Sequence, residues 1–378
     1  MTLIRFITLS LLLFSQTLLA APKPIPKAPE IAATSYILLD YASGKVLAQK
    51  NPDKRVEPAS ITKLMTAYLV DKALAAGDIS LTDKVTISEK AWRMKGSKMF
   101  VEVGKEVPVE ELIKGMIIQS GNDATVALAE HVAGSEDAFV EYMNHQAKLL
   151  GMNNTHFMNA TGWPHKNHYS TARDIATLTQ AIIKDFPQSY QYYKVKEYTY
   201  NNIRQFNRNR LLWRDSSVDG LKTGHTEAAG YCLVASAKKE KMRLISVVLG
   251  TKSDKARTQT SQTLLNYGFR FFESNKLYGA QESLKTARVW YGEQDQVALG
   301  VNKDIVVTIA RGRYKDLDAA VEIDPKITAP IAKGQELGRL VVKLDGDVLV
   351  SEPLVAMSAV NDGGLVKKAL DSVKILFE

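Results

Sequence analysis

A serine and a lysine stand three residues apart at the start of a long apolar segment. Ser60 and Lys63 open residues 60–75, where apolar side chains recur on several faces before Gly77 ends the run. This pattern predicts a helix buried in a core. Helical residues i and i+3 share a face, so the Lys63 amine can reach the Ser60 hydroxyl, and the helix N-terminus favours negative charge there. The pair predicts a nucleophilic serine with a lysine as its base.

A lysine acts as a base only when it is neutral. Substantial neutrality near pH 7 requires a pKa about 3 units below the ordinary value of about 10.4, which burial and a second cation can provide. Lys222, in the segment Lys222-Thr223-Gly224, is the candidate for that cation. Lys222 is equally a candidate for binding a substrate carboxylate.

A third motif, Ser120-Gly121-Asn122, falls between two predicted helices at 109–118 and 123–132. A break between helices presents polar side chains to a neighbouring site. We expect Ser120 to relay a proton to the leaving amine and Asn122 to hold the substrate amide.

The segment around Gly224 is predicted to be a strand of an antiparallel meander over residues 218–250. The small Gly224 would let a substrate lie along the strand edge as an added strand. The backbone N–H groups of Ser60 and His225 would then form an oxyanion hole, in which each donor is worth about a hundredfold or more in rate.

Each motif alone is a weak signal. A second Ser-x-x-Lys occurs at Ser236–Lys239, where a strand residue beside a charged turn is the simpler interpretation. Lys63 alone would fit a solvated helix residue, Asn122 a helix cap and Lys222 a strand end. The three motifs in this order and in these contexts favour an active site.

The chain must position this site within a larger architecture. Residues 1–20 are typical of a secretory signal peptide, because Arg5 precedes an apolar run at 6–14 and alanines stand at 20 and 21. Leu18 or Leu19 fills a position where a small residue is preferred, so an uncleaved anchor remains an alternative. Cleavage would export the chain.

The composition and turn signals divide the rest of the chain into four parts. Residues 21–34, with four prolines, are predicted to be a flexible leader, and residues 35–275 a catalytic domain. Short strands at regular intervals predict an all-β sandwich over residues 280–358. After a linker, residues 363–378 repeat apolar positions at helical spacing and predict an amphipathic helix.

Composition excludes several classes of protein. The chain has 378 residues, 45% of them apolar, and a net charge of +8, which suits an anionic membrane or wall polymer. Cys232 is the single cysteine, and no metal-binding spacing occurs, so neither a metal nor another cofactor is expected. Arginines 204, 208, 210 and 214 could mimic a nucleic-acid patch, but export favours a solvated or substrate-facing loop and no nucleic-acid partner.

The three motifs together resemble those of the type-5 low-molecular-mass penicillin-binding proteins, which are D-alanyl-D-alanine carboxypeptidases. The resemblance covers nearly everything after the signal peptide. Further segments that carry it are Gly121-Asn122-Asp123-Ala124, Asn154-Thr155-His156-Phe157, Ser170-Thr171-Ala172-Arg173-Asp174, Asn207-Arg208-Asn209, Val218-Asp219-Gly220, Lys222-Thr223-Gly224-His225-Thr226 and Gly268-Phe269-Arg270-Phe271-Phe272-Glu273.

This resemblance implies a fold and a reaction. The first domain would be an α/β (α+β) penicilloyl-serine transferase, or β-lactamase-like, domain of helices and an antiparallel sheet, with an ω-like loop ending near Asp174. The substrates would be peptidoglycan stem peptides, and β-lactams would be covalent inhibitors. The family adds the β-sandwich and the amphipathic tail, which would hold a periplasmic enzyme on the outer face of the cytoplasmic membrane.

An enzyme that cuts only chain ends must recognise a terminal carboxylate. Arg257 is the predicted ligand, together with Thr223. A short loop after the strand 243–249 would return Arg257 beside the strand that carries Lys222, and the carboxylate-binding arginine of the family falls at the matching place. The alternative is a solvated arginine at the start of a helix.

Two other functions compete. A class A β-lactamase needs a glutamate in the ω-loop, and residues 161–169 contain none; Glu197 with Asn201 matches the spacing but lies close to Lys222 in a predicted strand. A penicillin sensor without turnover would use the same fold. The complete set of motif residues favours turnover.

The C-terminal helix has its own alternatives. Its apolar stripe includes Leu365, Leu370 and Phe377, and about 20 apolar residues would be needed to span a bilayer, so we expect it to lie in the membrane interface. The alternative is a helix docked on its own β-sandwich. The lysines of the tail are nearly cancelled by Asp371 and Glu378.

Overall fold

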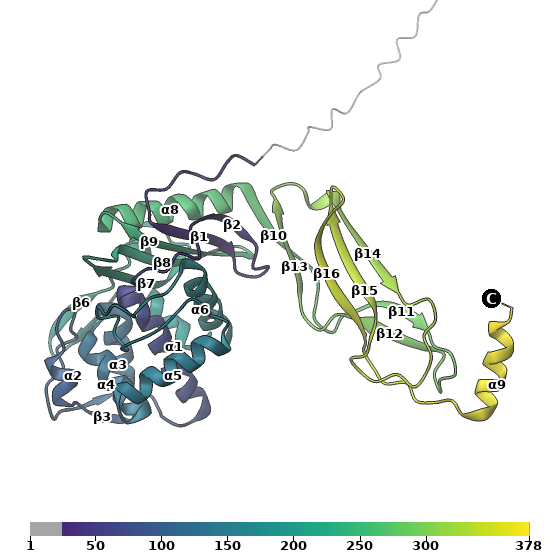
Figure 1. Ribbon diagram of the computed structural model, residues 1–378, viewed down its shortest axis with the longest axis horizontal. Coiled ribbons are helices and arrows are strands. Elements are labelled where there is room, and N and C mark those ends of the chain that lie inside the picture. The colour runs from purple at the N-terminus through teal and green to yellow at the C-terminus, as the bar shows by residue number, and fades with distance from the viewer. Residues whose placement is uncertain (1–24, 378) are drawn as a thin grey trace, which may run out of the picture.

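The computed structural model describes residues 25–377, so the predicted signal peptide lies outside the described residues. Two domains follow one another along the chain, and a single helix stands at the far end of the second (Figure 1). The described part of the predicted leader, residues 25–34, is not free. Ile31 and Ala33 are buried, and the Tyr267 hydroxyl donates to the Pro26 carbonyl at 3.0 Å.

A five-stranded antiparallel sheet forms the centre of the first domain, in the order β2-β1-β9-β8-β7. Successive side chains of a strand point to opposite faces. Ile37 accordingly packs into one core and Leu38 into the other, so both faces are covered. β7 is an edge strand. The strands are β1 (Ser35–Asp40), β2 (Val46–Lys50), β7 (Val218–Thr226), β8 (Gly230–Lys239) and β9 (Met242–Thr251).

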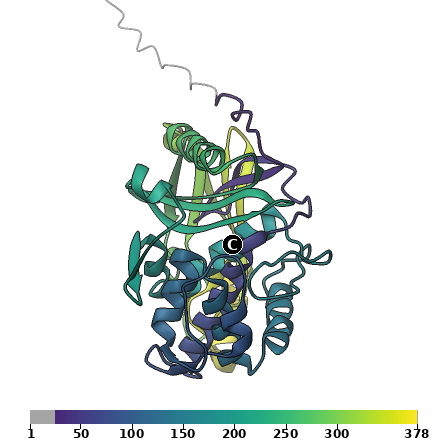
Figure 2. The same ribbon diagram turned by 90° about the vertical axis from the view of Figure 1, so that its left-hand side faces the viewer.

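Helices cover the two faces unequally (Figures 1 and 2). On one face lies α8 (Asp254–Phe271). On the other, a layer surrounds α1 (Lys63–Ala76), whose buried residues occupy all sides, as a central helix requires. The remaining elements are η1 (Ala59–Thr62), β3 (Lys84–Thr86), α2 (Glu89–Arg93), β4 (Glu106–Pro108), α3 (Val109–Lys114), η2 (Gly115–Gln119), α4 (Asn122–Ala133), α5 (Glu136–Leu149), α6 (Ala172–Asp185), η3 (Ser189–Lys194), β5 (Glu197–Tyr200), β6 (Ile203–Phe206) and α7 (Leu211–Arg214).

The second domain is a β domain that begins at Phe272. β10 (Phe272–Tyr278) follows α8 without a linker and pairs with β13 (Ile305–Ala310). The domain boundary therefore precedes the residues 275–280 expected from the sequence, because no turn residues separate helix from strand. A five-stranded sheet completes the domain, with β11 (Ser283–Arg288), β12 (Gln296–Gly300), β14 (Leu317–Ile323), β15 (Glu336–Leu344) and β16 (Asp347–Ala356). A 3-10 turn, η4 (Tyr314–Asp316), precedes β14.

The two domains meet at the turn between β1 and β2. The hydroxyls of Ser43 and Thr308 lie 2.6 Å apart, and the Lys45 amine donates to the Thr308 carbonyl at 3.0 Å. The last helix, α9 (Gly364–Ile375), lies at the end of the β domain remote from the catalytic domain (Figure 1).

Candidate active site

Ser60 lies in the 3-10 turn η1, one turn before α1, rather than in the first α-helical turn. The turn is held from two sides. Ile61 N–H donates to the Pro58 carbonyl at 3.1 Å. Gly162 packs so closely that a Cβ there would lie 1.8 Å from the Ala59 carbonyl oxygen. Ser60 opens into a cavity of about 220 Å³, whose other lining residues are Ser97, Ser120, Arg208, Thr223, Gly224, His225, Tyr231 and Arg257.

Lys63 lies beneath Ser60 and is almost completely buried. Its Nζ is 3.1 Å from Ser60 Oγ, 2.7 Å from Asn122 Oδ1 and 2.7 Å from the Thr161 carbonyl oxygen. Burial, together with the positive charge of Arg208, lowers the pKa of Lys63 to about 7, although Asp123 acts in the opposite direction. The amine is therefore neutral in a large fraction of molecules at neutral pH.

A neutral amine has two hydrogens and one lone pair. At Lys63 the two hydrogens match the two carbonyl-type acceptors, Asn122 Oδ1 and Thr161 O, and the lone pair is left for the hydroxyl hydrogen of Ser60. This is the arrangement that a base requires. Arg208 is a cation near Lys63 that the sequence did not identify, and the repulsion between Lys63 and Lys222 lowers the pKa of Lys222.

Ser120 and Lys222 form a second serine–lysine pair. Ser120 follows the π-helical turn η2 with a φ of 68°, a left-handed conformation that few non-glycine residues adopt and that often marks a functional site. Lys222 donates to Ser120 Oγ at 2.8 Å and to the Thr223 carbonyl at 3.2 Å. Burial, and then the charges of Lys63, Arg208 and Arg257, lower the pKa of Lys222.

Asn122 is the first residue of α4 and bridges two parts of the site. Its Oδ1 accepts from Lys63, and its Nδ2 donates to the Lys95 carbonyl at 2.7 Å. Its backbone N–H donates to the Ser97 carbonyl at 2.7 Å. A side-chain amide has two hydrogens, so one remains for the carbonyl of a substrate.

Gly224 has a packing role in addition to the one expected from the sequence. A Cβ at this position would lie 3.0 Å from the Pro58 carbonyl oxygen and 3.3 Å from the Ala59 Cβ. The glycine thus allows the nucleophile turn to pack directly on β7. This contact sets the separation between Ser60 and His225, whose backbone N–H groups are the expected oxyanion donors.

Arg257 is buried against β7 and β8 at the wall of the cavity, not solvated. Its Nη1 donates to the carbonyls of Gly224 at 3.1 Å and Cys232 at 3.3 Å, and its Nη2 bonds Asp254 at 2.5 Å. Its Nε is buried without a hydrogen-bond partner in residues 25–377. The sequence placed Arg257 beside the strand of Lys222, and the structure brings it there.

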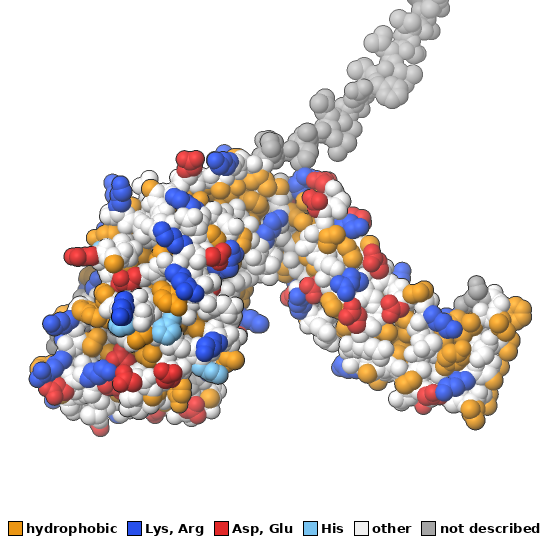
Figure 3. Space-filling model, in the orientation of Figure 1, with side chains coloured by type: hydrophobic (Ala, Val, Ile, Leu, Met, Phe, Trp, Pro, Cys, Tyr) orange, Lys and Arg blue, Asp and Glu red, His pale blue; other side chains and the backbone are white. Residues whose placement is uncertain are grey.

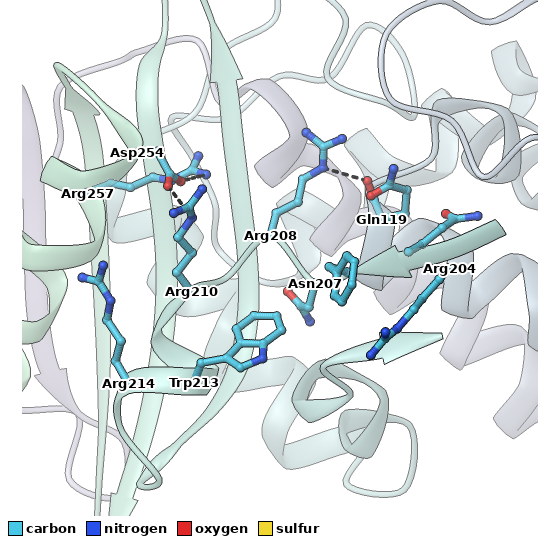
Figure 4. A pocket seen from close by; sticks show the side chains of 11 residues that line it. Gln119, Arg204, Asn207, Arg208, Arg210, Trp213, Arg214, Asp254 and Arg257 are labelled. Carbon is cyan, nitrogen blue, oxygen red and sulfur yellow. Dashed lines mark hydrogen bonds and ion pairs between the residues drawn. The ribbon is translucent and has the colours of Figure 1, made fainter. Parts of the chain in front are cut away.

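Arg208, expected from the sequence to lie in a solvated or substrate-facing loop, lies at the site. It lines the cavity with Arg257, and its Nε donates to the Gln119 carbonyl at 3.1 Å (Figure 4). Buried asparagines on either side hold the loop. Asn207 Nδ2 donates to the Val195 carbonyl at 3.0 Å and Asn209 Nδ2 to the Gly220 carbonyl at 3.0 Å. The Asn-Arg-Asn pattern was the available signal.

The geometry does not support the second Ser-x-x-Lys or the β-lactamase glutamate as parts of this site. Ser236, of the second Ser-x-x-Lys, is buried in β8 and accepts from Arg243 at 2.6 Å. Glu197 lies on the β5–β6 hairpin, is ion-paired with Arg204 and does not line the cavity of Ser60. His168 is buried, 2.8 Å from Thr62 Oγ1. No group of three potential metal ligands occurs within residues 25–377.

A serine beside a buried lysine, a second serine bonded to a second lysine and an open strand edge define a serine acyltransferase of the penicilloyl-serine transferase class. The family comparisons agree. Residues 23–253 match the model of the D-alanyl-D-alanine carboxypeptidase peptidase family, and residues 272–362 match the C-terminal domain of penicillin-binding protein 5. The chain belongs to the D-alanyl-D-alanine carboxypeptidase family.

Relatives match both domains. The chain is 47% identical to D-alanyl-D-alanine carboxypeptidase DacA of Escherichia coli, over 93% of this chain and 90% of the relative. Among solved structures, penicillin-binding protein 5 of Haemophilus influenzae superposes with a TM-score of 0.86 at 45% identity, covering 89% of this chain and all of that one. Penicillin-binding protein D2 of Listeria monocytogenes, in its ampicillin-bound form, gives a TM-score of 0.60 at 29% identity over 65% of this chain and 100% of its own. The protein is a serine-type carboxypeptidase of peptidoglycan metabolism.

Proposed function

We propose that the protein releases the terminal D-alanine of peptidoglycan stem peptides through an ester on Ser60, and that β-lactams acylate the same oxygen. The neutral Lys63 amine, 3.1 Å from Ser60 Oγ with its other bonds already satisfied, carries this proposal. In the acylation step Lys63 accepts the hydroxyl proton, and Ser60 Oγ attacks the carbonyl carbon of the penultimate residue. The N–H groups of Ser60 and His225 stabilise the oxyanion.

Ser120 completes the acylation. Because Lys222 donates to Ser120 Oγ, the hydroxyl hydrogen of Ser120 is free to point toward the leaving nitrogen. The C–N bond breaks as Ser120 relays the proton held by Lys63 to the amine, which leaves as D-alanine. Lys63 is then neutral again and can deprotonate the water that hydrolyses the ester.

The terminal carboxylate is proposed to lie between Thr223 and Arg257. The buried Nε of Arg257 lacks a partner in residues 25–377, and the Arg208 guanidinium lines the same cavity and reinforces the attraction of an anion. Charge-assisted hydrogen bonds of this kind are strong and directional. Mass spectrometry of a peptide ending in D-Ala-D-Ala tests the whole proposal: repeated release of one D-alanine is expected, and one acylation without turnover would indicate a sensor.

The pKa of Lys63 predicts the pH dependence of acylation. Because Lys63 is active when neutral, kcat/KM should rise with pH, level off above about 7, and fall by about tenfold for each unit below about 6. Arg208→Ala removes the cation that lowers this pKa, so the midpoint should move to higher pH. Arg208→Lys, which keeps the charge, is the control and should retain the midpoint. An unchanged profile in Arg208→Ala would contradict the role of Arg208.

We also propose a periplasmic protein attached to the membrane surface by α9. In the part of the chain that the structure describes, no helix is long and apolar enough to cross a membrane. α9 docks on the β domain by its polar side: Asp371 is buried and accepts from the Tyr291 N–H at 2.8 Å, and Lys367 pairs with Asp295 and Asp371. The apolar side chains remain outward (Figure 3), namely Leu365, Val366, Leu370, Val373, Leu376 and Phe377.

Because the polar side of α9 contacts the β domain, the structure does not favour the alternative in which the apolar stripe packs on the sandwich. It also predicts how the helix binds. Lys367 and Lys368 are already paired with carboxylates, so apolar insertion rather than charge should drive attachment. Deleting residues 363–378, or changing Leu370 to Asp, should release the protein from vesicles in a cosedimentation assay, while a rise in salt should change little. Release by salt alone would contradict this account.

A further inference from the structure

A groove of about 730 Å³, whose lining side chains are drawn in Figure 4, adjoins the active-site cavity. Arg208 and Arg257 line both, so the groove continues the cavity on the side where the terminal carboxylate is proposed to lie. Its wall carries five arginines and one carboxylate, Asp254. The groove therefore has more cationic side chains in its lining than the catalytic cavity has, and it is suited to a negatively charged ligand.

The arginines of the groove are not neutralised by the protein. Asp254 is shared between Arg210 at 2.7 Å and Arg257 at 2.5 Å. Arg204 pairs with Glu197. Arg214 forms no ion pair within residues 25–377. The five guanidinium groups of the groove thus pair with only two carboxylates, Asp254 in its wall and Glu197 outside it, and the excess positive charge favours an anionic ligand.

Like-charge repulsion points to the same conclusion. Burial and the neighbouring Arg257 lower the pKa of Arg208. The arginine side chains present planar donors suited to carboxylates. An anion near them would relieve the repulsion between these two residues.

Aromatic side chains stand at the same groove. Trp213 is 46% exposed and Phe206 is 50% exposed, and both line it. Such surfaces pack against methylene groups. The lining thus fits a short aliphatic chain that ends in a carboxylate.

We propose that the groove binds the side-chain carboxylate of a leaving residue larger than D-alanine, so that the enzyme also cleaves an amide bond between D-alanine and an acidic D-residue. This inference rests on the carboxylate position proposed above. The terminal carboxylate and the side chain of a residue share one Cα, so a carboxylate held at Arg257 brings the side chain to the groove. The methyl group of D-alanine leaves that space unfilled. The reaction is unchanged. Ser60 forms the ester, the C–N bond breaks, and the acidic amino acid leaves as a free amine after Ser120 has relayed a proton to its nitrogen.

Three peptides that differ only in the terminal residue, D-Ala, D-Gln or D-Glu, test the proposal. The ratio of kcat/KM for D-Glu over D-Gln isolates the side-chain charge, because the two are similar in size. We expect a ratio of about fivefold in the wild type, as for a partly exposed charge contact. The ratio should fall to about one in the double variant Arg210→Gln with Arg214→Gln.

The double variant Arg339→Gln with Lys343→Gln is the matched control, because it also removes two positive charges, both from β15 in the other domain. It should keep the wild-type ratio. A wild-type ratio near one, or a full ratio in the double variant of the groove, would overturn the groove proposal. D-alanine release, measured in parallel, keeps the two proposals apart: its loss in the wild type would overturn both, and its retention with a ratio near one overturns only the groove.

Discussion

Ser60→Ala is expected to abolish labelling by fluorescent penicillin and the release of D-alanine, with rates lower by about 10⁴-fold or more. The change removes the hydroxyl oxygen that is proposed to form the ester. The fold should persist, because Ser60 lines an open cavity and the turn around it is held by backbone contacts of Ile61 and Gly162. The measurements are the extent of labelling and the thermal unfolding temperature, which should stay close to that of the wild type.

Ser236→Ala is the matched control, since Ser236 begins the second Ser-x-x-Lys of the chain. Its buried hydroxyl accepts a hydrogen bond from Arg243 and does not line the cavity of Ser60, so labelling should remain at the wild-type level. Persistent labelling of Ser60→Ala, or a labelled peptide that contains Ser236, would refute the assignment.

Lys63→Ala should lose acylation as well, for a different reason. Without the amine no base lies beside Ser60, and Asn122 Oδ1 and Thr161 O lose a buried donor. Each unsatisfied group costs about 1–3 kcal/mol, so this variant should also unfold at a lower temperature than Ser60→Ala. A stable Lys63→Ala protein with full labelling would show that another group acts as the base.

The catalytic pair could be predicted because its geometry is local. Three residues of helical spacing place Lys63 beneath Ser60 even though Ser60 lies in a 3-10 turn. The antiparallel order of β7, β8 and β9 likewise follows from short strands joined by short turns, and the family comparisons confirm the predicted fold.

What the sequence did not reveal depends on contacts between distant segments. Arg208 reaches the site because Asn207 and Asn209 bond to carbonyls of other elements. The packing role of Gly224 depends on the approach of Pro58, and the choice between the two orientations expected for α9 depends on the burial of Asp371 against Tyr291. Such contacts leave no periodic signal in one chain.

The terminal carboxylate provides the second large effect. Arg257→Ala is expected to lose about 1.5–3 kcal/mol of transition-state stabilisation on a peptide with a free carboxylate. The buried guanidinium, fixed by Asp254, is preorganised for this contact. The loss appears as a fall in kcat/KM.

Arg257 also supports β7 and β8 through the carbonyls of Gly224 and Cys232, so a fall in activity alone would be ambiguous. The peptide amide separates the two effects. The peptide amide lacks the negative charge. If Arg257 binds the carboxylate, the wild type and Arg257→Ala should therefore have similar kcat/KM values for the amide. A structural effect on β7 would reduce both substrates alike. Equal losses on acid and amide would therefore assign the carboxylate to Lys222 or Arg208, whose own alanine variants should then show the selective loss on the acid.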